Sequence, residues 1–195
     1  MKYTPKIQKA IKFSIKTHEV YQKQKRKGKD IAYITHPLTA GLILSLAGAD
    51  EDVIVAGILH DTIEDSIAEK KVDQELIAQR FGKKVAEIVM SVTETDKSLS
   101  WVQRKKEAIE HITHFSRESI LVKSADVLVN VNELIDDHNK HGDKIFRVFN
   151  APTPKKKNIL NNNLNTIKTI LKRWKENPLS DDLKRVVKEL EKMMN

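Results

Sequence analysis

Two pairs of residues that follow one apolar segment carry the strongest chemical signal in the chain. The hydrophobic stretch 53–59 is followed directly by His60-Asp61 and then by Glu64-Asp65. Burying three carboxylates and an imidazole without partners is costly, so such groups normally pair with cations or bind a metal. No Lys or Arg lies within residues 51–69. A divalent cation is the simplest partner for this cluster.

Helical spacing would bring these groups together. His60 and Glu64 are four residues apart, as are Asp61 and Asp65, so on one continuous helix each pair shares a face. Consecutive residues of a helix differ by about 100°, which still lets His60 and Asp61 converge on one ion near the helix end. We therefore expect a helix over residues 50–66 that presents the cluster.

Two further ligands must come from elsewhere in the chain. His36 falls in the first turn of the preceding helix, and Asp126 is an isolated carboxylate in the apolar stretch 121–130, with Asn130 four residues further on. Taken alone, His36 could be structural and Asp126 could pair with a Lys. Two imidazoles and two carboxylates together suit Mn²⁺, Fe²⁺ or Zn²⁺ better than Ca²⁺. Because the chain has no cysteine, any metal must be held by nitrogen and oxygen.

Hydrophobic periodicity predicts helices in almost every segment. Thr35 should cap a helix that holds Pro37 in its first turn and closes at Gly48, and Asp73 should cap another. After a polar loop over 93–100, further helices are expected at 101–115, 117–136, 140–149, 155–175 and 180–194. No stretch shows the alternation of a strand. We expect one all-α domain, a compact multi-helix bundle spanning residues 1–195.

Composition narrows the classes of partner. The net charge is +8, and residues 1–30 hold nine Lys and one Arg against two acids. Aromatic residues make up only 5% of the chain and no nucleic-acid motif is present, so we expect no nucleic acid but a small polyanion near Lys25–Lys27. The sequence shows neither a run of about 18 apolar residues nor a signal peptide. We therefore expect a cytoplasmic protein without a membrane partner.

This set of residues resembles the HD-domain metal-dependent phosphohydrolases, which are named after a His-Asp doublet, here His60-Asp61. Within that group it is most similar to the alarmone hydrolase domain of the RelA/SpoT proteins and their small stand-alone relatives. Four stretches carry the resemblance, in the family's order and at similar spacing over roughly residues 5–150: Gln24–Lys27, Tyr33–Pro37, His60–Asp65 and Val122–Asn130.

The resemblance implies an activity and a role for each matching residue. The family reaction removes the 3′-pyrophosphate from guanosine tetra- or pentaphosphate, giving GDP or GTP and pyrophosphate. One divalent ion, usually Mn²⁺ in this family, would be held by His36, His60, Asp61 and Asp126. The catalytic acid pair beside the ion would be Glu64 and Asp65. Contacts with the nucleotide substrate would come from Arg26, Lys27 and Asn130.

Two other functions remain open. Residues 155–160 read Lys-Lys-Lys-Asn-Ile-Leu where related hydrolases carry an aromatic-containing stretch, which leaves room for an HD hydrolase of another nucleotide or phosphoester. A non-catalytic nucleotide sensor on the same scaffold is the second alternative. The helices from about 155 onwards could cover the pocket or form the contact of a homo-oligomer. Lys97, Arg104 and Lys105 are further candidates for substrate contact.

Overall fold

The computed structural model describes residues 3–94, 96 and 98–194. Within this part of the chain the secondary structure is helical, apart from an isolated bridge between Lys25 and Ala32. The α-helices are α1 (Pro5–Ile15), α2 (Thr35–Leu46), α3 (Glu51–Leu59), α4 (Thr62–Asp65), α5 (Gln74–Phe81), α6 (Lys83–Val92), α7 (Trp101–His111), α8 (Arg117–His141), α9 (Lys155–Arg173) and α10 (Ser180–Met194). Shorter turns are the π-helix Lys16–Tyr21 and the 3₁₀ turns Ala68–Lys70, Ile112–His114 and Gly142–Val148. The all-α prediction is confirmed.

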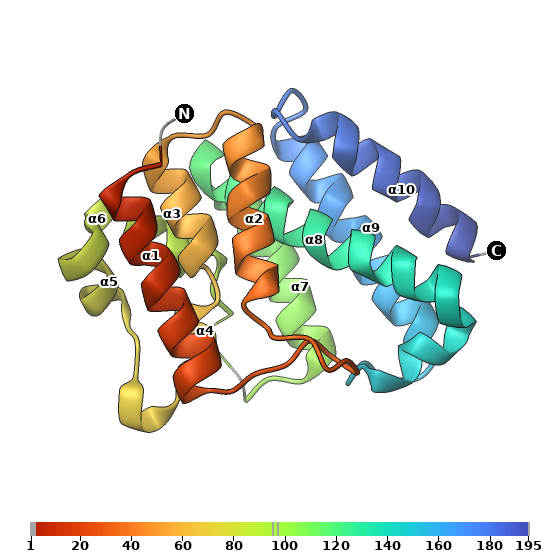
Figure 1. Ribbon diagram of the computed structural model, residues 1–195. Helices are drawn as coiled ribbons and strands as arrows, with labels where there is room; N and C mark the ends of the chain where they lie inside the picture. Colours follow the sequence, from red (N-terminus) through yellow and green to blue (C-terminus); the bar gives the residue numbers. More distant parts are fainter. Residues whose placement is uncertain (1–2, 95, 97, 195) are drawn as a thin grey trace.

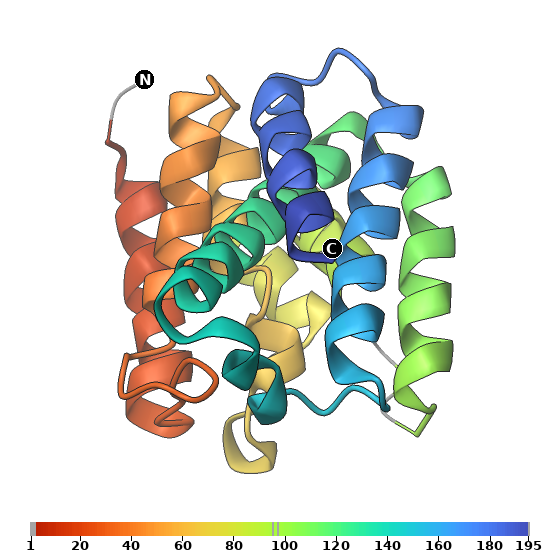
Figure 2. The ribbon, with the colours of Figure 1, turned by 90° about the vertical axis from the view of Figure 1, so that its right-hand side faces the viewer.

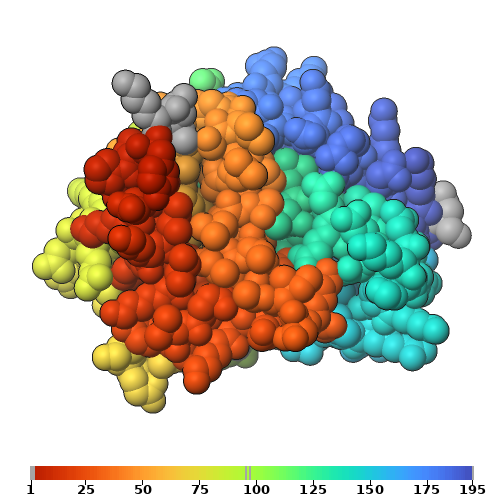
Figure 3. Space-filling model, in the orientation of Figure 1, coloured from red at the N-terminus to blue at the C-terminus, as the bar shows by residue number. Residues whose placement is uncertain are grey.

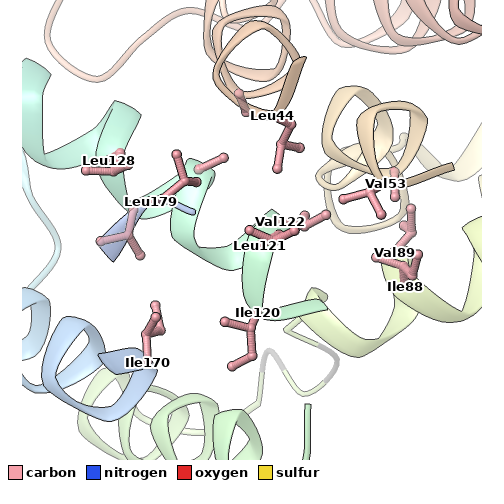
Figure 4. Packing of buried hydrophobic residues seen from close by; sticks show 14 of the residues in the cluster. Leu44, Val53, Ile88, Val89, Ile120, Leu121, Val122, Leu128, Ile170 and Leu179 are labelled. Atoms are coloured by element: carbon pink, nitrogen blue, oxygen red, sulfur yellow. The ribbon is translucent and has the colours of Figure 1, made fainter. Parts of the chain in front are cut away.

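The long helix α8 lies at the centre of the bundle. It packs against α2, α3 and α6 on one side and against α9 and α10 on the other, as Figures 1 and 2 show. Side chains from these helices, among them Leu44, Val53, Ile120 and Ile170, meet in the core (Figure 4). Figure 3 shows α1, α2, α8 and α10 adjoining on one face. Buried residues from Ile7 to Met193 form one hydrophobic cluster, and we propose that they constitute a single domain. No helix of the described chain is long and apolar enough to cross a membrane.

Helices α2 and α3 approach each other closely because glycine faces the partner helix on both sides. A Cβ at Gly57 would lie 2.2 Å from Leu44 Cδ1, and a Cβ at Gly41 would lie 2.6 Å from Ile58 Cγ1. Leu44 and Ile58 are themselves buried, so neither has room to move away. This contact fixes the separation between the first turn of α2 and the end of α3.

The continuous helix predicted over residues 50–66 is wrong. The helix that begins after Asp50 ends at Leu59, and α4 starts only at Thr62. Side chains compete with backbone N–H groups for the carbonyl oxygens at the end of α3. His60 Nδ1 lies 2.8 Å from the carbonyl oxygen of Gly57, and the Thr62 hydroxyl donates to the carbonyl oxygen of Leu59 at 2.7 Å. The break redirects the chain between His60 and the acids that follow it.

Other local predictions had mixed outcomes. Thr35 is the first residue of α2 rather than its cap; its hydroxyl donates to the carbonyl oxygen of Ala32. The close of α2 near Gly48 and the Asp73 cap are confirmed, the latter by a hydrogen bond from Leu76 N. Helix α8 continues to His141 instead of stopping at 136, and the helix expected over 140–149 is a 3₁₀ turn.

Gly57→Ala tests the close contact between α2 and α3. The substitution should destabilise the protein by about 1–3 kcal/mol through overpacking, because the helix-propensity gain of about 1 kcal/mol is smaller. Chemical denaturation would measure the free energy of unfolding. In a Leu44→Ala background, which removes the clashing methyl group, the same change should be neutral or stabilising. Equal destabilisation in both backgrounds would show that the contact does not limit the helix separation.

Candidate active site

Three buried side chains from three helices meet at one point. His36 comes from the first turn of α2, His60 follows the last turn of α3, and Asp126 lies in the middle of α8. Their exposed fractions are 2%, 4% and 8%. The Nε2 atoms of His36 and His60 are 3.1 Å apart. Asp126 Oδ1 lies 3.3 Å from His36 Nε2 and 3.8 Å from His60 Nε2.

Asp61 completes the set of predicted ligands. Its Oδ2 lies 3.1 Å from His60 Nε2 and 3.4 Å from His36 Nε2. Metal–nitrogen and metal–oxygen bonds of about 2.0–2.2 Å place ligand atoms roughly 3–4 Å from one another. The ligand atoms of His36, His60 and Asp126 all lie within 4.8 Å of one another. The geometry of these three residues fits one shared divalent ion, and Asp61, whose Oδ2 faces both imidazoles, stays the predicted fourth ligand.

The electrostatics of the cluster favours a cation. Burial opposes the charged form of His60, yet the carboxylates of Asp61 and Asp126 outweigh burial and raise the pKa of His60 to about 9. Burial also opposes ionised Asp126, but Lys123 and the two imidazoles hold the pKa of that carboxyl well below its usual range. The same negative field that favours a second proton on His60 would stabilise a divalent ion there.

Neighbouring polar groups hold the ligands in place. The contact between His60 Nδ1 and the Gly57 carbonyl oxygen suits a tautomer whose Nε2 carries the free lone pair. Asp126 accepts from Lys123 Nζ at 2.8 Å through Oδ2 and from Asn130 Nδ2 at 2.7 Å through Oδ1. Asp126 therefore pairs with Lys123, as the structural alternative in the sequence analysis suggested, and it also contacts both imidazoles.

Tyr33 is a site residue to which the sequence analysis gave no role. Its hydroxyl donates to Asp61 Oδ2 at 2.6 Å. Its ring lies between the imidazoles of His18 and His36, with centroid distances of 5.1 and 5.7 Å. Burial and the charge of Asp61 raise the pKa of Tyr33 far above its usual value, so the hydroxyl keeps its proton. The signal in the sequence was its place in the stretch Tyr33–Pro37, three residues before a candidate ligand His.

The two acids of the predicted catalytic pair face different surroundings. Glu64 lines the cavity beside the ligand cluster. Asp65 faces the π-helix Lys16–Tyr21, where its Oδ2 lies 3.9 Å from Nδ1 of the fully buried His18. The catalytic role of both stays a prediction, and Glu64 is the one placed to meet a ligand in the cavity.

A cavity of about 480 Å³ adjoins the cluster, a size typical of small-molecule sites. Its walls come from the segment 22–34 that precedes α2 (the α1–α2 loop) and from α7, α8 and α9. Helix α9 therefore covers the pocket, which is one of the two roles suggested above for the C-terminal helices. Aromatic side chains reach it from Tyr33, Trp101 and Phe149, while Ile159 is the member of 155–160 that lines it.

The predicted substrate contacts Arg26, Lys27 and Asn130 all line this cavity. Arg26 is already engaged: its Nε donates to Glu133 Oε2 at 2.8 Å and its Nη2 to Asn130 Oδ1 at 2.9 Å. Asn130 thereby links Arg26 to Asp126. Arg104 and Lys105 also line the cavity, whereas Lys97 lies outside the described residues.

Comparison with known proteins agrees with this geometry. The model of the HD-domain family matches residues 10–151, a span that contains all four candidate ligands. The chain belongs to the HD-domain family. The resemblance to HD-domain hydrolases, inferred from the four stretches named above, is therefore confirmed.

This HD-domain protein is similar to proteins named as guanosine-3′,5′-bis(diphosphate) 3′-pyrophosphohydrolases. It is 40% identical over 119 residues to guanosine-3′,5′-bis(diphosphate) 3′-pyrophosphohydrolase MESH1 of Danio rerio, an alignment covering 60% of this chain and 63% of the relative. The Xenopus tropicalis enzyme of the same name is 38% identical over 130 residues, covering 66% and 69%. A solved structure of a metazoan ortholog of SpoT that hydrolyses ppGpp matches with a TM-score of 0.78 over 97% of both chains at 22% identity, which shows the fold.

Tyr33→Phe tests whether the hydroxyl on Asp61 matters to the HD site. Removing this outer hydrogen bond should weaken Mn²⁺ binding about 10- to 100-fold, the range seen for outer-shell partners of metal ligands. Titration calorimetry with Mn²⁺ measures the affinity. Tyr21→Phe is the matched control, because that ring contacts Lys16 and Lys70 instead. Unchanged affinity in Tyr33→Phe would show that Asp61 does not depend on Tyr33.

Proposed function

We propose that the chain is a metal-dependent 3′-pyrophosphohydrolase of guanosine tetraphosphate, releasing GDP and pyrophosphate. The observation that carries the proposal is the cluster of the buried His36, His60 and Asp126 with the partly exposed Asp61, which opens onto a cationic cavity of about 480 Å³. The names of the Danio rerio and Xenopus tropicalis relatives support this substrate. Because the match spans 63% of the Danio rerio enzyme, the activity of that whole protein is transferred here as a proposal.

The four ligands would hold a divalent ion, with Mn²⁺ as the proposed metal. A bound divalent ion supplies Lewis acidity towards a phosphoryl oxygen and the attacking water. Asn130 and Lys123 orient the Asp126 carboxylate, and Tyr33 orients that of Asp61. Glu64, in the cavity wall, would take the proton of the attacking water. We also propose Asp65 as its partner in the acid pair, held against His18.

Two alternatives remain for the same site. An HD hydrolase of another nucleotide or phosphoester would use the same ligands, and the cavity contains no aromatic residue from 155–160. Trp101 and Phe149 supply aromatic surface in its place. A non-catalytic sensor is less favoured, because Glu64 would have no purpose beside the ligands. The cytoplasmic location and the homo-oligomer stay predictions.

Product analysis with purified protein tests the proposal. With Mn²⁺, guanosine tetraphosphate should yield equal amounts of GDP and pyrophosphate, and excess chelator should abolish the reaction. GTP, ATP and deoxynucleoside triphosphates supplied at the same concentration should turn over far more slowly. If Mn²⁺ binds while guanosine tetraphosphate stays intact, the substrate assignment is wrong; faster turnover of another nucleotide would support the first alternative.

Two substitutions separate metal binding from chemistry. Asp61→Ala should abolish both Mn²⁺ binding and turnover, because it removes a ligand. Glu64→Ala should keep the metal affinity within about twofold yet lower kcat by about 10²- to 10⁴-fold, the usual contribution of general acid–base catalysis. Glu69→Ala, at an exposed acid just beyond α4, is the control and should change neither. Loss of metal in Glu64→Ala would contradict its assigned role.

A further inference from the structure

A groove between α7 and α9 has no part in the catalytic site. The two helices lie side by side at the edge of the bundle (Figure 2), and we call the space between them the α7–α9 groove. Its volume is about 540 Å³. On the α9 side it runs from Asn158 to Lys172, a length of about 21 Å at the rise of an α-helix. Such a long, open groove suits a segment of chain better than a small molecule.

The charge of the α7–α9 groove is positive. Four lysines line it, and no Asp or Glu of the described chain does. Lys168 Nζ lies 3.7 Å from Glu191 Oε1, whereas Lys106 and Lys172 are exposed and form no ion pair within the described residues. Helix α9 itself carries five Lys and one Arg without any acid. The uncompensated charge favours an anionic partner.

Helix α7 adds apolar surface that the rest of the bundle leaves uncovered. None of its residues, Trp101–His111, is buried. Trp101, Val102 and Ile109 all line the groove, and Val102 is 56% exposed. Covering such surface with an apolar side chain is favourable. A purely ionic ligand would leave it in water, so the partner should carry aliphatic groups as well as negative charge.

Helix α9 adds two side-chain amides that face the groove without partners. Asn161 and Asn165 line it, and within the described residues neither side chain forms a hydrogen bond. Residues four apart on a helix are separated by about 6 Å along its axis. Residues on the same side of an extended strand repeat about every 6.6 Å. An Asn amide both donates and accepts, so this pair can bind successive peptide groups of an extended chain.

We propose that the α7–α9 groove is a docking site for an extended acidic segment of a partner protein, in which carboxylates alternate with aliphatic side chains. About six extended residues match its length. Aliphatic groups on one side of the strand would contact Val102 and Ile109, and the carboxylates would meet Lys106 and Lys172. Nucleic acid fits less well, because single strands stack successive bases on aromatic rings, and Trp101 is the one aromatic residue of the described chain in the groove. The inference does not depend on which substrate the HD site hydrolyses.

Fluorescence anisotropy with a labelled peptide of alternating Glu and Leu, about eight residues long, tests the groove. The wild-type protein should bind this acidic probe at least about tenfold more tightly than a peptide of alternating Lys and Leu. Lys106→Glu/Lys172→Glu should weaken binding of the acidic probe about 10- to 30-fold, because two exposed attractions become repulsions. Asn161→Ala/Asn165→Ala should weaken it about 3- to 30-fold through lost hydrogen bonds to the peptide main chain. None of these four residues lines the catalytic cavity.

The matched control is Lys12→Glu/Lys188→Glu, which makes the same change of net charge at exposed residues of α1 and α10 outside the groove. At physiological ionic strength, where the Debye length is about 8 Å, it should keep the affinity within about twofold of the wild-type value. An equal loss in this control would overturn the proposal, because the attraction would then be spread over the whole protein.

Other outcomes would overturn the docking site directly. These are no binding of the acidic probe, equal binding of the Lys-Leu peptide, and undiminished binding in the Lys106→Glu/Lys172→Glu variant. Full binding in Asn161→Ala/Asn165→Ala would contradict recognition of an extended main chain. Tighter binding of an oligouridylate of the same length, lost in the lysine variant, would show that the groove takes nucleic acid instead.

Discussion

The structure depends on the convergence of two imidazoles and two carboxylates inside a helical core. His36 lies on α2 and Asp126 on α8, whereas His60 and Asp61 lie in the break between α3 and α4. The Nε2 atom of each imidazole lies 3.1–3.8 Å from the ligand atoms of the other three residues. Such an arrangement is unfavourable unless a cation balances the carboxylates. The close glycine contact between α2 and α3 is therefore part of the site, because it sets how near the two imidazoles can come.

The polar groups around this cluster form a continuous network that reaches the substrate cavity. Asn130 touches both Asp126 and Arg26, Arg26 is bound to Glu133, and Glu133 also holds Lys29. The loop that carries the basic residues is thus fixed to the same helix that carries a candidate metal ligand. A change in the position of α8 would move both together, which explains why the site needs α8 at the centre of the bundle.

The sequence was sufficient to single out the four candidate ligands, because each is a polar exception in an apolar segment. It could not reveal the break at His60, which depends on side chains competing for the carbonyl oxygens of Gly57 and Leu59. It also could not show that Arg26 is bound by Glu133, a residue 107 positions away that looks like any exposed helical acid. Local spacing predicts local faces, whereas these contacts arise only when α8 packs against the α1–α2 loop.

Anomalous diffraction from crystals grown with Mn²⁺ would test the central claim most directly. The account predicts one strong manganese peak per chain, with His36 Nε2, His60 Nε2 and a carboxylate oxygen from each of Asp61 and Asp126 at bonding distance. A peak at another set of residues would contradict the account. So would the lack of any peak at saturating Mn²⁺ with these four side chains still converging.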